Sequence, residues 1–208
     1  MMMKIVKKYM FLSVVLSLLS VSAWAAPADP VAMLKNLSDQ TISKLKANQA
    51  EIKKNPQATY NLIQTILMPH VDLMGMSRSV VGKKYWDEAA PAQQKEFSEQ
   101  FSSLIAGTYV SALQSYTNQQ IKFYPVRGGL QPEQTRVEIN SVILQPNGPS
   151  IPVNYRLILK NNEWVMYDLI VDSVSLLNSY RAQFATPLQE GGLPTLIEQL
   201  KQHNKKAL

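Results

Sequence analysis

The sequence has no cysteine and only two histidines, and these absences exclude several kinds of chemistry. Without cysteine there is no disulfide, no thiol nucleophile and no thiolate metal ligand, so stability must come from a hydrophobic core. His70 and His203 lie far apart in the sequence, and neither accompanies the cluster of carboxylates that a metal site or general-base catalysis usually shows. A glycine-rich nucleotide motif and an E-x-x-H motif are also absent. These absences weigh against an enzyme.

No hydrophobic run is long enough to span a bilayer. The most apolar stretch, residues 9–21, is shorter than the roughly 20 residues that a spanning helix needs and is interrupted by serines. Lysines precede it, and the small residues Ala23 and Ala25 follow it in an A-x-A cleavage pattern. No cysteine follows to carry a lipid anchor. We therefore predict a cleaved secretory signal peptide at residues 1–25 and one soluble domain at residues 26–208, located in the periplasm of a Gram-negative cell.

A strong charge bias is missing as well. The predicted signal peptide carries three of the 21 basic residues and none of the 15 acidic ones, so the mature chain has 18 minus 15, or +3. The basic residues are scattered among acids, with no stripe that alternates with aromatic residues. The composition therefore gives no support to nucleic-acid binding.

Periodic hydrophobic patterns divide the remaining chain into helices followed by strands and then helices. Helical spacing changes to alternation after Asn118, and no linker or repeat interrupts the sequence. Asn147–Gly148 and Asn161–Asn162 stand where hairpin turns are needed. We predict an α+β fold in which helices pack on a strongly curved four-stranded antiparallel sheet. The expected helices cover residues 32–52, 55–68, 77–85, 91–116, 175–185 and 194–208, and the strands begin near residues 121, 137, 151 and 163.

The strand at residues 163–171 is apolar on both faces, whereas an antiparallel strand often leaves one face in water. Helices can cover one face, and the other requires more protein or a bound apolar ligand. A solid core is the simpler interpretation. Four methionines and two helix tyrosines favour a pocket instead, because methionine adapts to varied apolar ligands and a tyrosine hydroxyl needs a polar exit. These residues are Met68, Met74, Met76, Met166, Tyr109 and Tyr116.

Asp168 is the one acid inside this apolar strand, and two roles are open to it. It can act as a general base with Tyr167 in a small-molecule enzyme. It can equally accept hydrogen bonds from backbone N–H groups or from Arg181. Arg181 in turn can hold a ligand phosphate or only Asp168.

Two segments, residues 80–113 and 164–184, resemble the MlaC, or toluene-tolerance (Ttg2-type), family of periplasmic phospholipid-binding proteins. Two departures from the family pattern occur: Asp172–Ser173 replaces a common Glu-Gly, and the asparagine that normally precedes Tyr-Arg is displaced to Asn178. The matching residues are Gly82, Trp86, Phe97, Phe101, Tyr109, Asp168, Ser175, Leu176, Tyr180 and Arg181.

The resemblance implies an NTF2-like cup that encloses an apolar pocket for acyl chains. It implies a non-enzymatic, monomeric carrier that shuttles phospholipid between the outer and inner membranes and so maintains outer-membrane lipid asymmetry. No cofactor is expected, since the phospholipid is cargo. The implied partners are an inner-membrane ABC transporter complex with an MCE-domain protein and an outer-membrane lipoprotein–porin complex. A pocketed enzyme and a periplasmic chaperone for acylated proteins remain the alternatives.

Candidate site residues follow from the face that each side chain occupies. Head-group or partner contacts are expected at Lys83, Lys84, Arg127 and Arg181. The expected lipid-binding residues are Leu73, Met74, Met76, Tyr109, Leu113, Tyr116, Val137, Ile139, Val153, Tyr155, Leu157, Val165, Tyr167 and Leu169.

Overall fold

The computed structural model describes residues 28–146 and 148–207, and its fold is the predicted α+β arrangement. The predicted signal peptide and Asn147 lie outside the described residues. None of the helices in the described ranges has the length and apolar character that crossing a bilayer requires. The helical elements are α1 (Pro30–Ala47), α2 (Gln49–Lys54), α3 (Pro56–Leu62), the π-helix η2 (Ile63–Leu67), the 3-10 helix η3 (Met68–His70), α4 (Leu73–Val81), α5 (Lys83–Glu88), α6 (Pro91–Gln114) and α7 (Leu176–Ala207).

The sheet is antiparallel throughout and its strands follow in chain order, as a meander. The four predicted strands are present, and a fifth of only two residues follows them. Asn161 and Asn162 form the predicted turn between the third and fourth strands, with φ of 50° and 67°, as a type I′ hairpin requires. The strands are β1 (Gln120–Phe123), β2 (Arg136–Leu144), β3 (Ile151–Lys160), β4 (Glu163–Val171) and β5 (Val174–Ser175).

Several predicted helix boundaries were wrong, for local reasons. Asn48 has φ −116° and ψ 22°, which divides the first predicted helix into α1 and α2. Asp72 caps α4 by accepting a hydrogen bond from the backbone N–H of Gly75 at 3.1 Å, so this helix begins before residue 77. Gly82 then ends α4 with φ 82°, a left-handed conformation that favours glycine.

The last helix is bent in the middle, close to where two helices were predicted. Gly191 and Gly192 are non-helical, and Gly192 has φ 67°. The segment after the bend packs back on α6, where Lys201 pairs with Glu96 over 2.5 Å. α7 is therefore two helical segments joined at a glycine corner.

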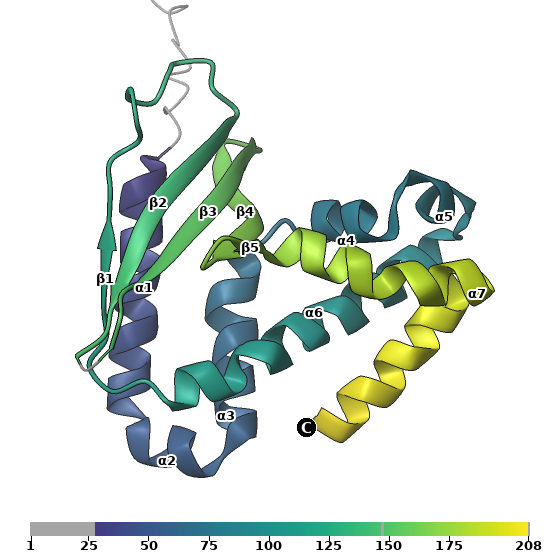
Figure 1. Ribbon diagram of the computed structural model, residues 1–208, viewed down its shortest axis with the longest axis horizontal. Helices are drawn as coiled ribbons and strands as arrows, with labels where there is room; N and C mark the ends of the chain where they lie inside the picture. Colours follow the sequence, from purple (N-terminus) through teal and green to yellow (C-terminus); the bar gives the residue numbers. More distant parts are fainter. Residues whose placement is uncertain (1–27, 147, 208) are drawn as a thin grey trace, which may run out of the picture.

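Helices cover the sheet unevenly. Figure 1 shows α1 against one face of the sheet, while α4 and α7 extend from the side of β5, and α6 runs from below the sheet, beside α3, toward α4 and α7. An aromatic core joins these helices: the rings of Phe101 and Tyr180 lie 5.1 Å apart, and Phe97, Phe101 and Phe184 pack on one another. We call the group of α4, α5, α6 and α7 the helical lobe.

Candidate functional site

The register of the strands divides the sheet into two chemically different faces. Residues paired across strands point to the same side, so Ile139, Tyr155 and Leu169 share one face. We call this the inner face, and it is almost wholly apolar. It comprises Val137, Ile139, Ser141, Ile143, Ile151, Val153, Tyr155, Leu157, Leu159, Trp164, Met166, Leu169 and Val171.

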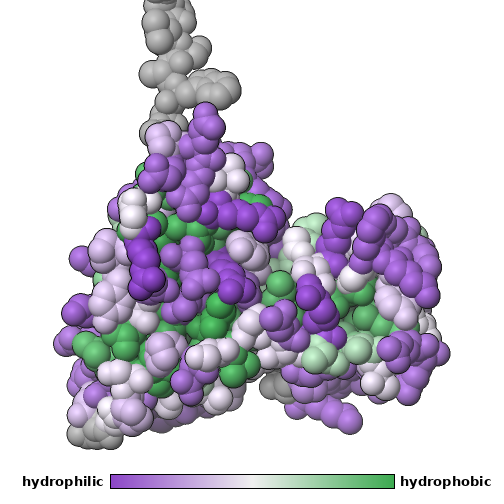
Figure 2. Space-filling view, turned by 45° about the horizontal axis from the view of Figure 1, so that its top comes forward, coloured by the Kyte–Doolittle hydropathy of each residue, from purple (hydrophilic) through white to green (hydrophobic). Residues whose placement is uncertain are grey.

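The inner face is buried at one end and partly open along β4. Leu34 of α1 packs with Val137, Leu157 and Trp164 in one cluster. Of the nine residues of β4, by contrast, only Trp164 and Asp168 are buried. Its other apolar side chains keep part of their surface accessible, although β4 lies between two other strands. Figure 2 shows hydrophobic surface, in green, among the hydrophilic residues on the sheet side of the molecule.

The predicted α6 residues lie in a second apolar cluster that adjoins the first. Tyr109 and Leu113 pack with Ile63 of η2, and Tyr116 is partly buried at the end of the same helix region. The two clusters meet through η2 and η3: α1 contacts η2, and Val71 after η3 forms a parallel bridge with Met166 of β4. The inner face of the sheet is thus connected to the apolar side of α6 through η2 and η3, and Tyr167 of β4 packs against the same helical core as Tyr109.

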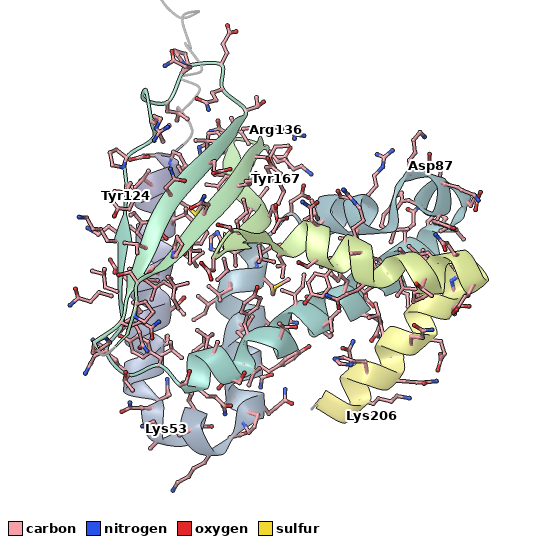
Figure 3. All side chains as sticks on the ribbon, in the orientation of Figure 1. Lys53, Asp87, Tyr124, Arg136, Tyr167 and Lys206 are labelled. Carbon is pink, nitrogen blue, oxygen red and sulfur yellow. The ribbon has the colours of Figure 1, made fainter. Side chains whose placement is uncertain are left out.

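Two predicted β4 residues lie on the other face of the sheet. A β-bulge opposite Arg156 and Leu157 breaks the strict alternation, so that Val165 and Tyr167 do not share a face with Leu169. The guanidinium of Arg136 lies 5.3 Å above the Tyr167 ring, and Figure 3 shows the two side chains together at one end of the sheet. The prediction of a common face was wrong for these two residues, and their lipid contact stays a prediction.

The three predicted residues of α4 have different surroundings. Met76 is only 2% exposed and belongs to the core of the helical lobe, whereas Met74 is 50% exposed. Leu73 is partly buried against the same core. The methionines therefore do not form one continuous lining, and α4 offers the inner face no row of apolar side chains.

Asp168 is fully engaged by structural contacts. Its Oδ2 atom accepts hydrogen bonds from Ser175 Oγ at 2.8 Å and from Arg156 Nη1 at 3.3 Å. Its Oδ1 atom accepts one from the backbone N–H of Leu177 at 3.0 Å. Arg181, which was the predicted side-chain partner, instead donates to Ser79. The structural role is the one that this geometry favours, with Arg156 in place of Arg181.

Burial raises the pKa of three tyrosines around the apolar clusters. Desolvation is the main cause that raises the pKa of Tyr109 to about 12, with smaller contributions from Tyr180 and Asp168. Burial also raises the pKa of Tyr155, on the inner face, and that of Tyr180, whose hydroxyl lies 3.0 Å from Thr108 Oγ1. These phenols stay protonated at neutral pH and can donate a hydrogen bond at an otherwise apolar surface.

Two of the four predicted basic contacts come together in one place. Lys83 and Arg181 line an open pocket of about 390 Å³, which we call the basic pocket. Arg78 also lines it and was not predicted, because an isolated exposed arginine carries no distinguishing pattern in the sequence. Lys84 lies over the Tyr85 ring instead, and Arg127 is exposed between β1 and β2. The other lining residues are Gly75, Ser79 and Gly82.

The described residues contain no group of three or more His, Cys, Asp or Glu side chains arranged to hold a metal ion. A curved antiparallel sheet with one apolar, incompletely covered face and a helical lobe at its edge defines the class of α+β proteins that form a cup for an apolar ligand. The sequence identifies the family within this class. Residues 35–202 match the family described as MlaC protein, so the chain belongs to the MlaC family.

Relatives and a solved structure agree with this assignment. The toluene tolerance protein ttg2D of Pseudomonas putida is 31% identical over 167 residues, which cover 80% of this chain and 76% of that protein. The intermembrane phospholipid transport system binding protein MlaC of Haemophilus influenzae is 27% identical over 180 residues, which cover 85% of this chain and 83% of that protein. The structure of a phospholipid-binding protein from Ralstonia solanacearum, in complex with a phospholipid, superposes with a TM-score of 0.79 at 27% identity and covers 86% of this chain and 99% of that one.

Proposed function

We propose that this protein is a phospholipid carrier of the periplasm that moves lipid between the outer and inner membranes. The observation that carries the proposal is the likeness, along almost all of its length, to a protein solved with a bound phospholipid. Membership of the MlaC family and the partly open apolar inner face support it.

The physical need for such a carrier is large. An acyl chain of roughly 15 methylenes costs about 12 kcal/mol to expose to water, at about 0.8 kcal/mol per methylene. A protein that crosses an aqueous compartment with lipid must therefore keep the chains away from water. An apolar surface that is folded but incompletely covered by its own protein meets that need.

We place the acyl chains between the inner face of the sheet and the apolar side of α6. Met166, Leu169 and Val171 of β4 are accessible there, and Tyr109 and Leu113 lie in the adjoining cluster. The raised pKa of Tyr109 fits a phenol that stays neutral beside hydrocarbon. Of the predicted lining residues, Met76 packs in the core of the helical lobe and Tyr167 points away from the inner face, so the binding surface proposed here is smaller than the one predicted.

A non-enzymatic role agrees with the state of Asp168, the only acid of β4 besides the terminal Glu163. Its carboxylate is 1% exposed and holds three hydrogen bonds from protein groups, so it presents no free oxygen to a substrate. We propose further that the carrier exchanges its cargo by docking transiently with an inner-membrane ABC transporter complex that includes an MCE-domain protein, and with an outer-membrane lipoprotein–porin complex.

A transfer assay tests the carrier function. Donor vesicles hold a phospholipid with a self-quenching fluorescent acyl chain, acceptor vesicles hold none, and the purified protein is added in catalytic amounts. We expect fluorescence to rise with a rate proportional to protein concentration. A rate no faster than that of vesicles alone, together with co-purification of acylated polypeptides, would favour the chaperone alternative.

A further inference from the structure

The basic pocket lies on the helical lobe, between α4, the beginning of α5 and α7. Three cations border it: Arg78, Lys83 and Arg181. Asp87 is the acid that pairs with two of them, through a contact with Lys83 and a longer one of 3.8 Å to Arg78. These four side chains carry three positive charges and one negative charge, so the pocket is left with +2.

Asp87 is an internal counter-ion. The hydrogen bond from Lys83 is the largest cause that lowers its pKa, and Arg78 adds to the effect. The carboxylate therefore remains ionised and offsets one of the three cations. The two remaining positive charges favour the binding of a further anion.

Two hydrogen bonds fix the orientation of the Arg181 guanidinium, which favours the binding of such an anion. Its Nε atom donates to the backbone oxygen of Ser79 at 3.1 Å, and its Nη2 atom donates to Ser79 Oγ at 2.8 Å. These two bonds use two of the five N–H groups of this guanidinium. A planar guanidinium fixed in this way matches the two oxygens of a carboxylate and loses little freedom on binding one.

The anion does not belong to the lipid cargo proposed above. The opposite side of α4 is buried in the helical core, where Met76 and Val80 are 2% and 1% exposed. This core separates the basic pocket from the inner face of the sheet. In Figure 3, Asp87 lies at the far end of the helical lobe from Arg136 and Tyr167, which mark the end of the sheet.

A membrane surface also fits the pocket poorly. Its three cations are fewer than the roughly 4–8 clustered Lys/Arg residues that are typical of adsorption to an anionic bilayer. A single glutamate or aspartate side chain on a protein surface supplies an anion that matches this small group of cations. Charge complementarity of this kind sets the register and the rate of protein association.

We propose that the basic pocket receives an acidic side chain of a protein partner that docks on α4, α5 and α7. The proposal rests on the carrier function only because a carrier must dock to exchange its cargo. Beyond the carrier function, the proposal specifies which surface docks with the partner and that the partner contributes an acidic side chain.

The test uses protein purified from cells that express the full chain, and a fluorescein-labelled peptide of five Glu-Gly repeats as the probe. Binding is followed by fluorescence anisotropy at low salt for the wild type and for Arg78→Glu, Lys95→Glu and Asp87→Asn. Arg78 and Lys95 are a matched pair: their side chains are 58% and 76% exposed, and each lies 3.8 Å from an acid. Both reversals change the net charge equally.

We expect Arg78→Glu to weaken peptide binding about tenfold or more and Lys95→Glu to change it less than about twofold. Asp87→Asn removes the internal counter-ion and should tighten binding. Equal losses in the two reversals, no tightening in Asp87→Asn or no binding by the wild type would overturn the proposal. It would be overturned as well if inorganic phosphate or phosphatidylglycerol vesicles, but not the peptide, bound in an Arg78-dependent way.

The lipid content of the same preparations separates this proposal from the carrier function. Lipid-loaded protein that does not bind the peptide contradicts the docking surface alone. Lipid-free protein that binds the peptide through Arg78 contradicts the carrier function alone.

Discussion

Ser175 Oγ donates a hydrogen bond of 2.8 Å to Asp168 Oδ2 and thereby joins the end of the sheet to the start of α7. Leu177, in the first turn of α7, donates its backbone N–H to the same carboxylate. An acid in the middle of an apolar strand is thus explained by the helix that it anchors. Asp72 makes a similar joint at α4, where it caps the helix and pairs with Lys160 of β3 at 2.7 Å.

Replacing Asp168 with asparagine should destabilise the fold. We expect no loss of a catalytic activity, because the carboxylate has a structural role. The variant weakens a charge-assisted contact to Arg156 and places an NH₂ group or a neutral oxygen opposite the Leu177 N–H. We expect the free energy of unfolding to fall by about 2–3 kcal/mol, measured by urea denaturation.

Asp172→Asn is the matched control for this variant. Asp172 is exposed in the next turn with φ 48°, a conformation that asparagine also adopts. Its stability should stay within about 0.5 kcal/mol of the wild type. Equal stability of Asp168→Asn and the wild type, with turnover of a small molecule lost, would instead support the enzyme alternative.

Filling the inner face should displace lipid. Leu169→Trp adds bulk where we place the acyl chains, whereas Ile170→Trp adds the same bulk on the opposite face of the same strand. We expect the first variant to lose most of its bound phospholipid and its transfer activity, and the second to keep both. Equal lipid content in two folded variants would contradict the location of the acyl chains.

Gly107 and Gly192 should respond oppositely to replacement by alanine. Gly192 has φ 67° and ψ −162°, which an L-residue adopts only under strain, so Gly192→Ala should cost about 1–3 kcal/mol of stability. Gly107 lies inside α6, and an added Cβ there meets nothing within 4 Å. Gly107→Ala should therefore stabilise the protein by about 0.5–1 kcal/mol. Thermal melting of both variants checks the pair, and the same sign of change in both would contradict it.

Stability should fall at alkaline pH because of Tyr109. Its pKa is about 12 in the folded protein and 10.0 for an unperturbed tyrosine. Between these values the unfolded chain loses the proton while the folded protein keeps it, so the free energy of unfolding decreases as pH rises. Two pKa units correspond to about 2.7 kcal/mol, and solvent screening of the partly exposed ring reduces the expected loss to about 2 kcal/mol. Tyr109→Phe should make the decline from pH 10 to 12 shallower, and an unchanged slope in urea denaturation would contradict this origin.

The sheet was predicted well from sequence wherever one residue pattern decides the structure. The alternation from Ile151 to Leu159 requires a strand, and Asn161–Asn162 requires a tight turn, because both signals are local. The bulge at Tyr167 has no such signal. A strand that is apolar on both faces looks the same in either register, so pairing with β3 alone decides which side chains share a face.

The basic pocket could not be predicted from the sequence, for a different reason. Ser79 and Arg181 are 102 residues apart in the chain and meet only because α7 packs on α4. Lys83 and Arg181 were recognised separately as basic residues, but their joint position depends on that packing. The burial of Met76 likewise follows from the helical core and not from its neighbours in sequence.

Native mass spectrometry of the protein, purified from the periplasm without detergent, tests the carrier function most directly. A mass increment that solvent extraction identifies as phospholipid, present in a fixed ratio to the protein, is the expected result. A protein that carries no lipid, and takes up none after incubation with phospholipid vesicles, would show that the inner face is not a lipid-binding surface.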